Sequence, residues 1–219
     1  MKILLIAVAF LICPNYLFAQ EDTYETTSAK IDGVRYKAIY RSSDWSISIL
    51  NADGKTVLHL KNTDYYDEGF SSFKFVDFNG DGYKDLFIEH MSNVPGRCDL
   101  LLYDSRIKKF APVKDFPDYP DPQKLKGTHL YYSYHRSGCA DMNWDSDLFK
   151  IVNNKIIKIG NISGLGCERD KKMGIFISKI NGKEERQIQK YPIGEIEKYK
   201  DYKWGFIKKY WERNSRKFI

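Results

Sequence analysis

Short runs of alternating hydrophobic and polar residues dominate this chain. Phe73 and Phe75, for example, alternate with Ser72 and Lys74, which is the period-two pattern of a strand with one buried face. Segments rich in Asn, Asp and Gly separate the hydrophobic runs, and these residues favour tight hairpin turns. The turn segments are Asn51-Ala52-Asp53-Gly54, Asn79-Gly80-Asp81-Gly82, Asp104-Ser105-Arg106, Asn153-Asn154-Lys155 and Asn181-Gly182-Lys183. The pattern predicts an all-β fold made of hairpins.

The predicted hairpins recur at similar intervals, with room for one more unit around His129 to Arg136. Such repetition is typical of a small β-propeller-like or meander domain, although a sandwich or a barrel gives similar spacing.

Two segments depart from this pattern. The segment from Phe116 to Lys126 contains three prolines and is expected to be an exposed loop or an edge crossing. Near the C-terminus, Trp204, Ile207 and Trp211 fall at helical spacing, which predicts a short amphipathic helix. Alternation of aromatic residues around Trp204 leaves a closing strand as the alternative.

The N-terminal segment has the pattern of a secretory signal peptide. Lys2 precedes an apolar run from Ile3 to Cys13, and Ala19 offers a small residue at a cleavage point. We predict a signal peptide at residues 1–19 and a single β-rich domain at residues 20–219, periplasmic or secreted. No later run approaches the roughly 20 apolar residues that cross a bilayer, so no transmembrane anchor is expected.

Composition and charge narrow the classes of partner. The chain is 42% hydrophobic, which is enough for a real core, and its formal net charge is +6. Much of the positive excess lies between Lys198 and Lys217, where a solvated face that aids solubility is favoured over a polyanion site. No motif for nucleic-acid binding is present, so nucleic acid is not expected as a partner.

An odd number of cysteines follows the predicted signal peptide, in a compartment where disulfides form. Cys139 and Cys167 each follow a glycine at a predicted loop, whereas Cys98 begins a hydrophobic run. We expect a Cys139–Cys167 bridge, with a Cys98–Cys139 bridge as the main alternative.

The segment from Asp77 to Asp85, here called the Asp loop, has the oxygen pattern of a calcium site. Oxygen-bearing side chains stand at positions one, three, five and nine, position seven can supply a backbone carbonyl, and Gly80 and Gly82 allow the backbone to curl. The twelfth position is Ile88 and the flanks are strand-like, which excludes an EF-hand. A hairpin turn without metal is the simpler alternative.

The Asp loop resembles the calcium-binding hairpin loops of FG-GAP and VCBS repeats. That resemblance implies that Ca²⁺ is bound by four side chains and one carbonyl. The side chains are Asp77, Asn79, Asp81 and Asp85, and the carbonyl is that of Tyr83.

Catalysis has weaker support. The four histidines form no known zinc motif, and no nucleophile elbow is present. Asp141, Asp145 and Asp147 could supply paired carboxylates for glycoside hydrolysis, but turn chemistry or a second weak cation site explains them more simply. We therefore expect no enzymatic activity.

A tyrosine-rich run precedes the short segment Arg136-Ser137-Gly138. With the signal peptide and the Asp loop, the region from Phe70 to Ile159 resembles bacterial periplasmic inhibitors of invertebrate-type lysozymes, some of which act as immunity proteins. The resemblance implies a propeller-like domain in which Arg136, Ser137 and Gly138 plug the cleft of a lysozyme. A hairpin loop fixed by a disulfide is the simpler explanation of the same residues.

The sequence therefore predicts a calcium-binding, non-catalytic β protein that inhibits a lysozyme-like peptidoglycan hydrolase. A cell-surface adhesion or assembly module is the alternative, and a glycan-cleaving enzyme that uses Asp141 and Asp147 is the third class.

Overall fold

The computed structural model describes residues 22–61, 69–167 and 173–219. The predicted signal peptide at residues 1–19 lies outside these ranges. None of the helices in the described ranges is long and apolar enough to cross a membrane.

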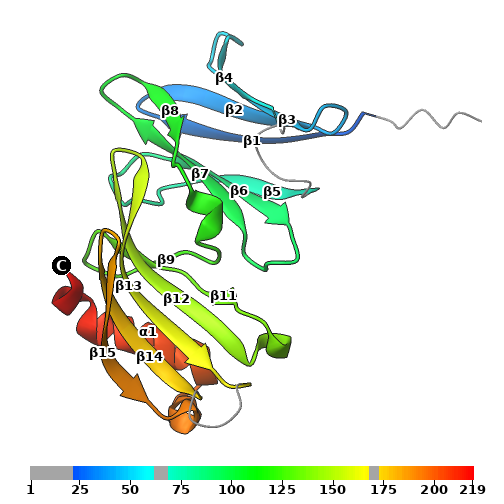
Figure 1. The fold of residues 1–219 in the computed structure, drawn as a ribbon. Coiled ribbons are helices and arrows are strands. Elements are labelled where there is room, and N and C mark those ends of the chain that lie inside the picture. Colours follow the sequence, from blue (N-terminus) through cyan, green and yellow to red (C-terminus); the bar gives the residue numbers. More distant parts are fainter. Residues whose placement is uncertain (1–21, 62–68, 168–172) are drawn as a thin grey trace, which may run out of the picture.

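Three antiparallel sheets make up most of the structure (Figure 1). The first sheet pairs its strands in chain order, β1 (Tyr24–Ile31), β2 (Val34–Arg41), β3 (Ser46–Leu50) and β4 (Thr56–Leu60). The second sheet does the same with β5 (Gly69–Val76), β6 (Asp85–Met91), β7 (Cys98–Asp104) and β8 (Lys109–Pro112).

The third sheet is larger, with the order β15-β14-β13-β12-β10-β9, and β11 also pairs with β12. Its strands are β9 (Gln123–Lys124), β10 (Leu130–Tyr132), β11 (His135–Arg136), β12 (Asn143–Val152), β13 (Lys155–Leu165), β14 (Gly174–Asn181) and β15 (Glu184–Tyr191). The helical elements are the 3-10 helices η2 (Phe116–Asp118), η3 (Cys139–Asp141), η5 (Ile193–Lys198) and η6 (Ser215–Phe218), and the α-helix α1 (Tyr202–Asn214).

Three hydrophobic clusters hold the layers together. Ile49 of the first sheet and Leu86 of the second belong to one cluster, so these two sheets pack face to face. A second cluster joins Leu100 of the second sheet to Phe149 of the third, with Phe116 of η2 between them. The third lies on the other face of the third sheet, where Trp211 of α1 is buried. The chain is thus a stack of three sheets closed on one side by a helix.

The five predicted turns all connect neighbouring antiparallel strands, so this part of the prediction is confirmed. Their residues meet the steric demand of a tight turn. Asn153 and Asn154 both adopt positive φ, at 51° and 56°, a region that Asn tolerates better than most residues.

The predicted fold class needs two corrections. The protein is mostly β rather than all-β, because residues 202–214 form α1, which confirms the helix and excludes the closing strand. Within the described ranges the three sheets close into neither a propeller nor a barrel. Open sheets suffice here because each hydrophobic face is covered by the next layer.

The proline-rich segment from Phe116 to Lys126 is an edge crossing, as predicted, but it is not fully exposed. It contributes β9 at the edge of the third sheet, while Phe116 and Leu125 are buried in the hydrophobic clusters. The prolines do not prevent this burial, since a short 3-10 turn accepts Pro near its first position.

Candidate functional site

The Asp loop connects β5 to β6 and is organised by its own carboxylates. The carboxylate of Asp77 accepts hydrogen bonds from the backbone N–H groups of Gly80, Asp81 and Gly82, at 2.7, 3.1 and 3.0 Å. Gly80 and Gly82 have positive φ, 75° and 92°, as the sequence predicts for a curled backbone. The loop thus wraps around the first of its acidic side chains.

Asp85 ends the loop and is fully buried at the start of β6. One carboxylate oxygen accepts the N–H of Phe78 at 3.1 Å, and the other accepts the N–H of Tyr103 on the neighbouring β7 at 2.9 Å. Burial raises the pKa of Asp85 to about 6, although these hydrogen bonds oppose the shift. Asp85 therefore fastens the loop to the second sheet.

Other contacts complete the Asp loop. The side chain of Asn79 accepts the N–H of Asp81, and Asp81 in turn accepts the N–H of Tyr83, both at 2.9 Å. The ammonium group of Lys124 on β9 donates to the carbonyl of Asn79, which ties the loop to the edge of the third sheet.

The predicted calcium ligands are therefore gathered in one loop, but each of the four predicted side-chain ligands has a role that needs no cation. In the described ranges, no group of three or more His, Cys, Asp or Glu side chains is arranged to hold a metal ion. A carboxylate oxygen has two lone pairs, so one that accepts an N–H can still bind a cation. Calcium at the Asp loop stays a prediction.

The second predicted site lies at the far end of the third sheet, where β11 leads into η3 and then β12. We call residues 136–140 the tip. All five are exposed, including the predicted contact residues Arg136, Ser137 and Gly138. The tip projects from a rigid support, because His135 and Arg136 pair with β12 on the way in.

Covalent and polar contacts fix the tip. Cys139 is bonded to Cys167 across a Cα–Cα distance of 6.1 Å, which confirms the predicted disulfide, whereas Cys98 is a buried free thiol. The Ser137 hydroxyl donates to Asp145 on β12, and the N–H of Ser137 donates to the carbonyl of Asn143 at 2.9 Å.

The alternative Cys98–Cys139 bridge is excluded, because Cys98 lies in the cluster between the second and third sheets.

The backbone of this segment is strained. Gly138 is followed by three non-glycine residues with positive φ: Cys139 at 55°, Ala140 at 49° and Asp141 at 71°. Each non-glycine residue in this left-handed conformation costs roughly 1 kcal/mol relative to the right-handed conformation. Such a run therefore persists only where contacts with the surrounding structure impose it.

Asp141 supplies much of that constraint. Its carboxylate accepts the hydroxyl of Tyr134 at 2.5 Å and the ammonium of Lys203 at 2.6 Å, and Lys203 also donates to the Asp141 carbonyl at 2.8 Å. Burial alone would raise the pKa of Asp141, but these partners outweigh it and the pKa is lowered. Lys203 lies in the first turn of α1, so the C-terminal helix holds the base of the tip.

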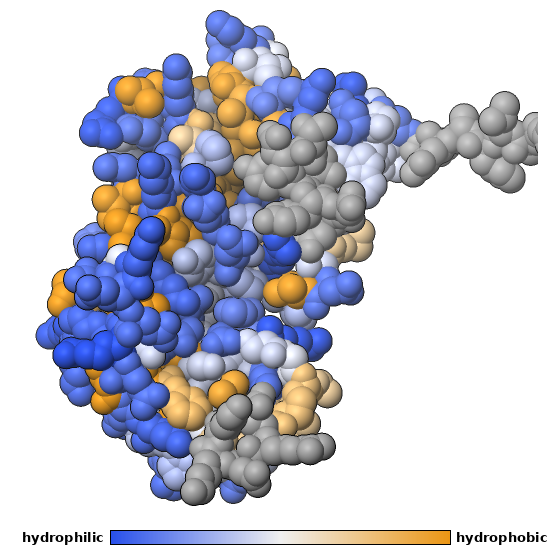
Figure 2. Space-filling view, in the orientation of Figure 1, coloured by the Kyte–Doolittle hydropathy of each residue, from blue (hydrophilic) through white to orange (hydrophobic). Residues whose placement is uncertain are grey.

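Exposed hydrophobic side chains lie next to the tip. On the face drawn in Figure 2 the surface is mainly hydrophilic, and hydrophobic residues show only in small groups. Met142, Tyr202 and Trp204 are nevertheless 51%, 62% and 47% exposed, and all three line a cavity of about 340 Å³ with Asp141. This exposed group was not predicted from the sequence. The aromatic residues Tyr202 and Trp204, on either side of Lys203 in the sequence, could have indicated it.

Asp141 and Asp147, which were considered for catalysis, are each held by their own partners. Asp147 is 5% exposed and bound by Lys158 at 2.6 Å and Asn161 at 2.7 Å. Burial alone would raise its pKa, but His135, Lys158 and Asn161 lower it. The pKa values of Asp141 and Asp147 are thus both lowered, each by its own hydrogen-bonding and charged partners.

Comparisons with known proteins give one distant likeness. No protein-family model and no curated protein sequence matches the chain. Among the solved structures that match is one described as a Xanthomonas type IV secretion system related protein. The two share 14% sequence identity with a TM-score of 0.49, over 75% of this chain and 93% of the other. A likeness at this level does not carry an argument about function.

Proposed function

We propose that the protein is a secreted or periplasmic, non-catalytic binding protein that inhibits a lysozyme-like peptidoglycan hydrolase through its tip. The observation that carries the proposal is a tip whose five residues are all exposed and yet held by a disulfide, by β12 and by α1. A protein inhibitor gains affinity when its contact segment is rigid before binding, because little conformational entropy is then lost.

The chemistry of the tip suits a glycosidase cleft. Such clefts contain a pair of carboxylates, and a guanidinium group can bind a carboxylate through two parallel hydrogen bonds. The side chain of Arg136 is 55% exposed, and its only ion pair in the described ranges is a long one of 3.9 Å to Asp141. Trp204 and Tyr202 beside the tip add the kind of aromatic side chain that often anchors interfaces.

Inhibition of lysozyme activity tests the proposal directly. Purified protein with its disulfide intact is added at micromolar concentration to chicken-type, goose-type and invertebrate-type lysozymes. We expect inhibition of at least one type, weakened about tenfold or more by Arg136→Ala. Arg106→Ala is the matched control, since it removes an exposed arginine from a turn of the second sheet.

Failure to inhibit any of the three types would refute the inhibitor function. Stable binding of a cell-surface protein that lacks hydrolase activity would then favour the adhesion or assembly module.

We also propose that the Asp loop binds Ca²⁺ in a structural role. The support is its set of ligand types, because carboxylate, amide and carbonyl oxygens are what this hard cation prefers. Titration calorimetry on protein stripped with EDTA should show one site per chain, and Asp77→Ala should abolish it. Absence of heat and of any rise in melting temperature with calcium would refute the site.

A further inference from the structure

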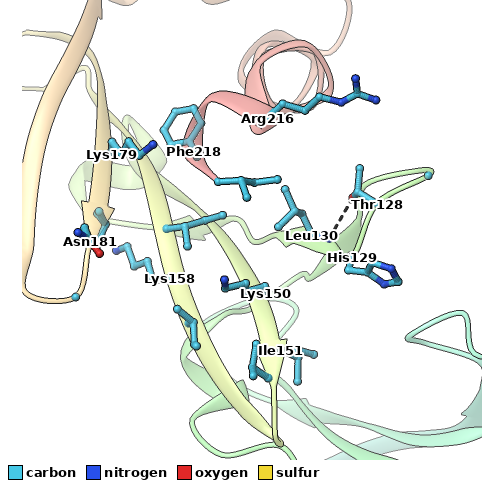
Figure 3. Close-up of a pocket in the computed structure, with 17 residues that line it drawn as sticks. Thr128, His129, Leu130, Lys150, Ile151, Lys158, Lys179, Asn181, Arg216 and Phe218 are labelled. Atoms are coloured by element: carbon cyan, nitrogen blue, oxygen red, sulfur yellow. Dashed lines mark hydrogen bonds between the residues drawn. The ribbon is translucent and has the colours of Figure 1, made fainter.

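A second cavity lies at the other end of the third sheet from the tip. Its volume is about 760 Å³, within the usual range for small-molecule sites. Figure 3 shows that its walls come from neighbouring strands of the third sheet, from the turn before β10, and from the C-terminal segment. The tip adjoins Asn143 and the cavity is lined by Lys150, so the two sites lie roughly 20 Å apart along β12.

The floor and rim of this cavity are apolar. Leu130, Ile159 and Phe218 line it and belong to the hydrophobic cluster beneath α1. Ile157 and Val152 also line it and are 42% and 40% exposed. Water therefore contacts large aliphatic side chains here, and a ligand that covered them would gain hydrophobic free energy.

The charged side chains around the cavity all have one sign. Lys150, Lys179 and Arg216 line it, and none of the described lining residues is Asp or Glu. The ammonium of Lys179 donates to the carbonyl of Lys217 at 2.8 Å, which fixes its position without neutralising its charge. Lys158 also lines the cavity, but its ammonium is already paired with Asp147. The cavity therefore favours an anionic group at an apolar site.

The strands that line the cavity are paired on some sides only. β12 pairs with β13 along the cavity, but the pairing of β13 with β14 ends at Gly160 and Lys179, so Ile157 and Ile159 line the cavity beyond the end of that ladder. The hydroxyl of Thr128 donates to the carbonyl of Leu125 at 2.8 Å. A flexible hydrocarbon chain needs no polar partner on the apolar floor, whereas a peptide that lay there would have to satisfy its own polar groups.

We propose that this cavity binds an amphipathic anion with a single alkyl chain, such as a long-chain carboxylate. The alkyl chain lies on Leu130, Ile159 and Phe218, and the carboxylate lies near Lys150, Lys179 and Arg216. This site is independent of the tip and of the inhibitor function.

Calorimetry with dodecanoate, below its micelle concentration, tests the proposal. We expect one molecule to bind per chain, while butyrate and dodecyltrimethylammonium bind at least tenfold more weakly. The double variant Lys150→Gln with Arg216→Gln should reduce dodecanoate affinity about tenfold. Arg213→Gln is the matched control, because Arg213 is an exposed cation of α1 that does not line the cavity.

Four results would overturn this site. One is the absence of saturable dodecanoate binding. The second is equal affinity for dodecyltrimethylammonium. The third is an equal loss of affinity in Arg213→Gln and in the double variant. The fourth is binding of an acidic peptide in this cavity in preference to dodecanoate. An independent check is Ile157→Asp, which places a negative charge on the exposed rim and should weaken dodecanoate binding without lowering the melting temperature.

Discussion

Lys203 is a buried lysine whose ammonium group is surrounded by specific partners. It contacts the carboxylate and the carbonyl of Asp141 and lies 4.6 Å from the ring centre of Trp204 and 5.4 Å from that of Tyr134. A buried ammonium group is stable only when its charge is compensated in this way. One side chain thus joins the helix, the tip and the aromatic group beside it.

Replacing Lys203 should loosen the tip. We expect Lys203→Met to lower the free energy of unfolding by about 2 kcal/mol, because the Asp141 carboxylate loses its charged donor. Inhibition of the target hydrolase should fall as well. Urea denaturation and the lysozyme assay measure the two effects. Lys208→Met, at an exposed position of the same helix, should change neither.

His135 gives the protein a defined pH dependence. The Asp147 carboxylate, 3.7 Å away, raises the pKa of His135; Asp145 acts in the same direction, and burial and Lys158 oppose the shift. Because the folded state binds this proton more tightly, the stabilisation is present below the unfolded pKa of about 6.5 and is lost as pH rises through the folded value.

The His135 effect can be isolated by substitution. We expect the free energy of unfolding to fall between pH 6 and pH 8 more steeply in the natural protein than in His135→Gln. Urea denaturation at several pH values measures the difference. His129→Gln leaves the His135 pair intact and should keep the steep fall, so parallel curves for the natural protein and His135→Gln would contradict this account.

At the scale of elements, the disulfide joins η3 to the segment that follows β13 and closes a loop with a sequence separation of 28. The bridge acts where the backbone is least favourable, beside the run of positive φ angles. Its contribution is therefore both to the stability of the fold and to the shape of the tip.

Removal of the disulfide should separate these two contributions. The variant with Cys139→Ser and Cys167→Ser should lose about 3.5 kcal/mol of stability, judged from the length of the closed loop. Denaturant titration checks this value. If the tip acts through its rigidity, inhibition should fall further than the loss of folded protein explains. Full inhibition by the folded variant would show that the bridge does not shape the contact surface.

The hairpins and the disulfide could be predicted from the sequence, but the support that α1 gives to the tip could not, and the reason is physical. Turn residues such as Asn153 and Asn154 act locally, so their effect can be read from neighbouring positions. The contact between Lys203 and Asp141 joins residues 62 positions apart and depends on where α1 packs. The Asp loop lies between these cases. Its internal hydrogen bonds are local, but the hydrogen bond that the N–H of Tyr103 donates to Asp85 is not.

At the scale of the whole molecule, the cluster around Phe116 joins the second sheet to the third. Phe116 is fully buried and packs edge-on against Phe78 and Phe87. Phe78 also stacks on Tyr131 of β10, with ring centres 5.1 Å apart. The Asp loop that carries Phe78 is therefore part of the contact between the two sheets.

Truncating Phe116 tests whether the layers unfold together. We expect Phe116→Ala to cost about 3 to 5 kcal/mol, the usual range for a buried aromatic side chain. Scanning calorimetry should then show either one transition at lower temperature or two separate ones. Tyr24→Ala, at an exposed position of β1, should leave the natural transition nearly unchanged.

Cys98 lies in the same cluster, fully buried, and burial raises the pKa of its thiol. A thiol of this kind is unreactive toward maleimides as long as the second and third sheets remain in contact, because only the exposed thiolate reacts quickly. The rate at which Cys98 is labelled in the natural protein therefore measures how often these two layers separate, with no engineered probe.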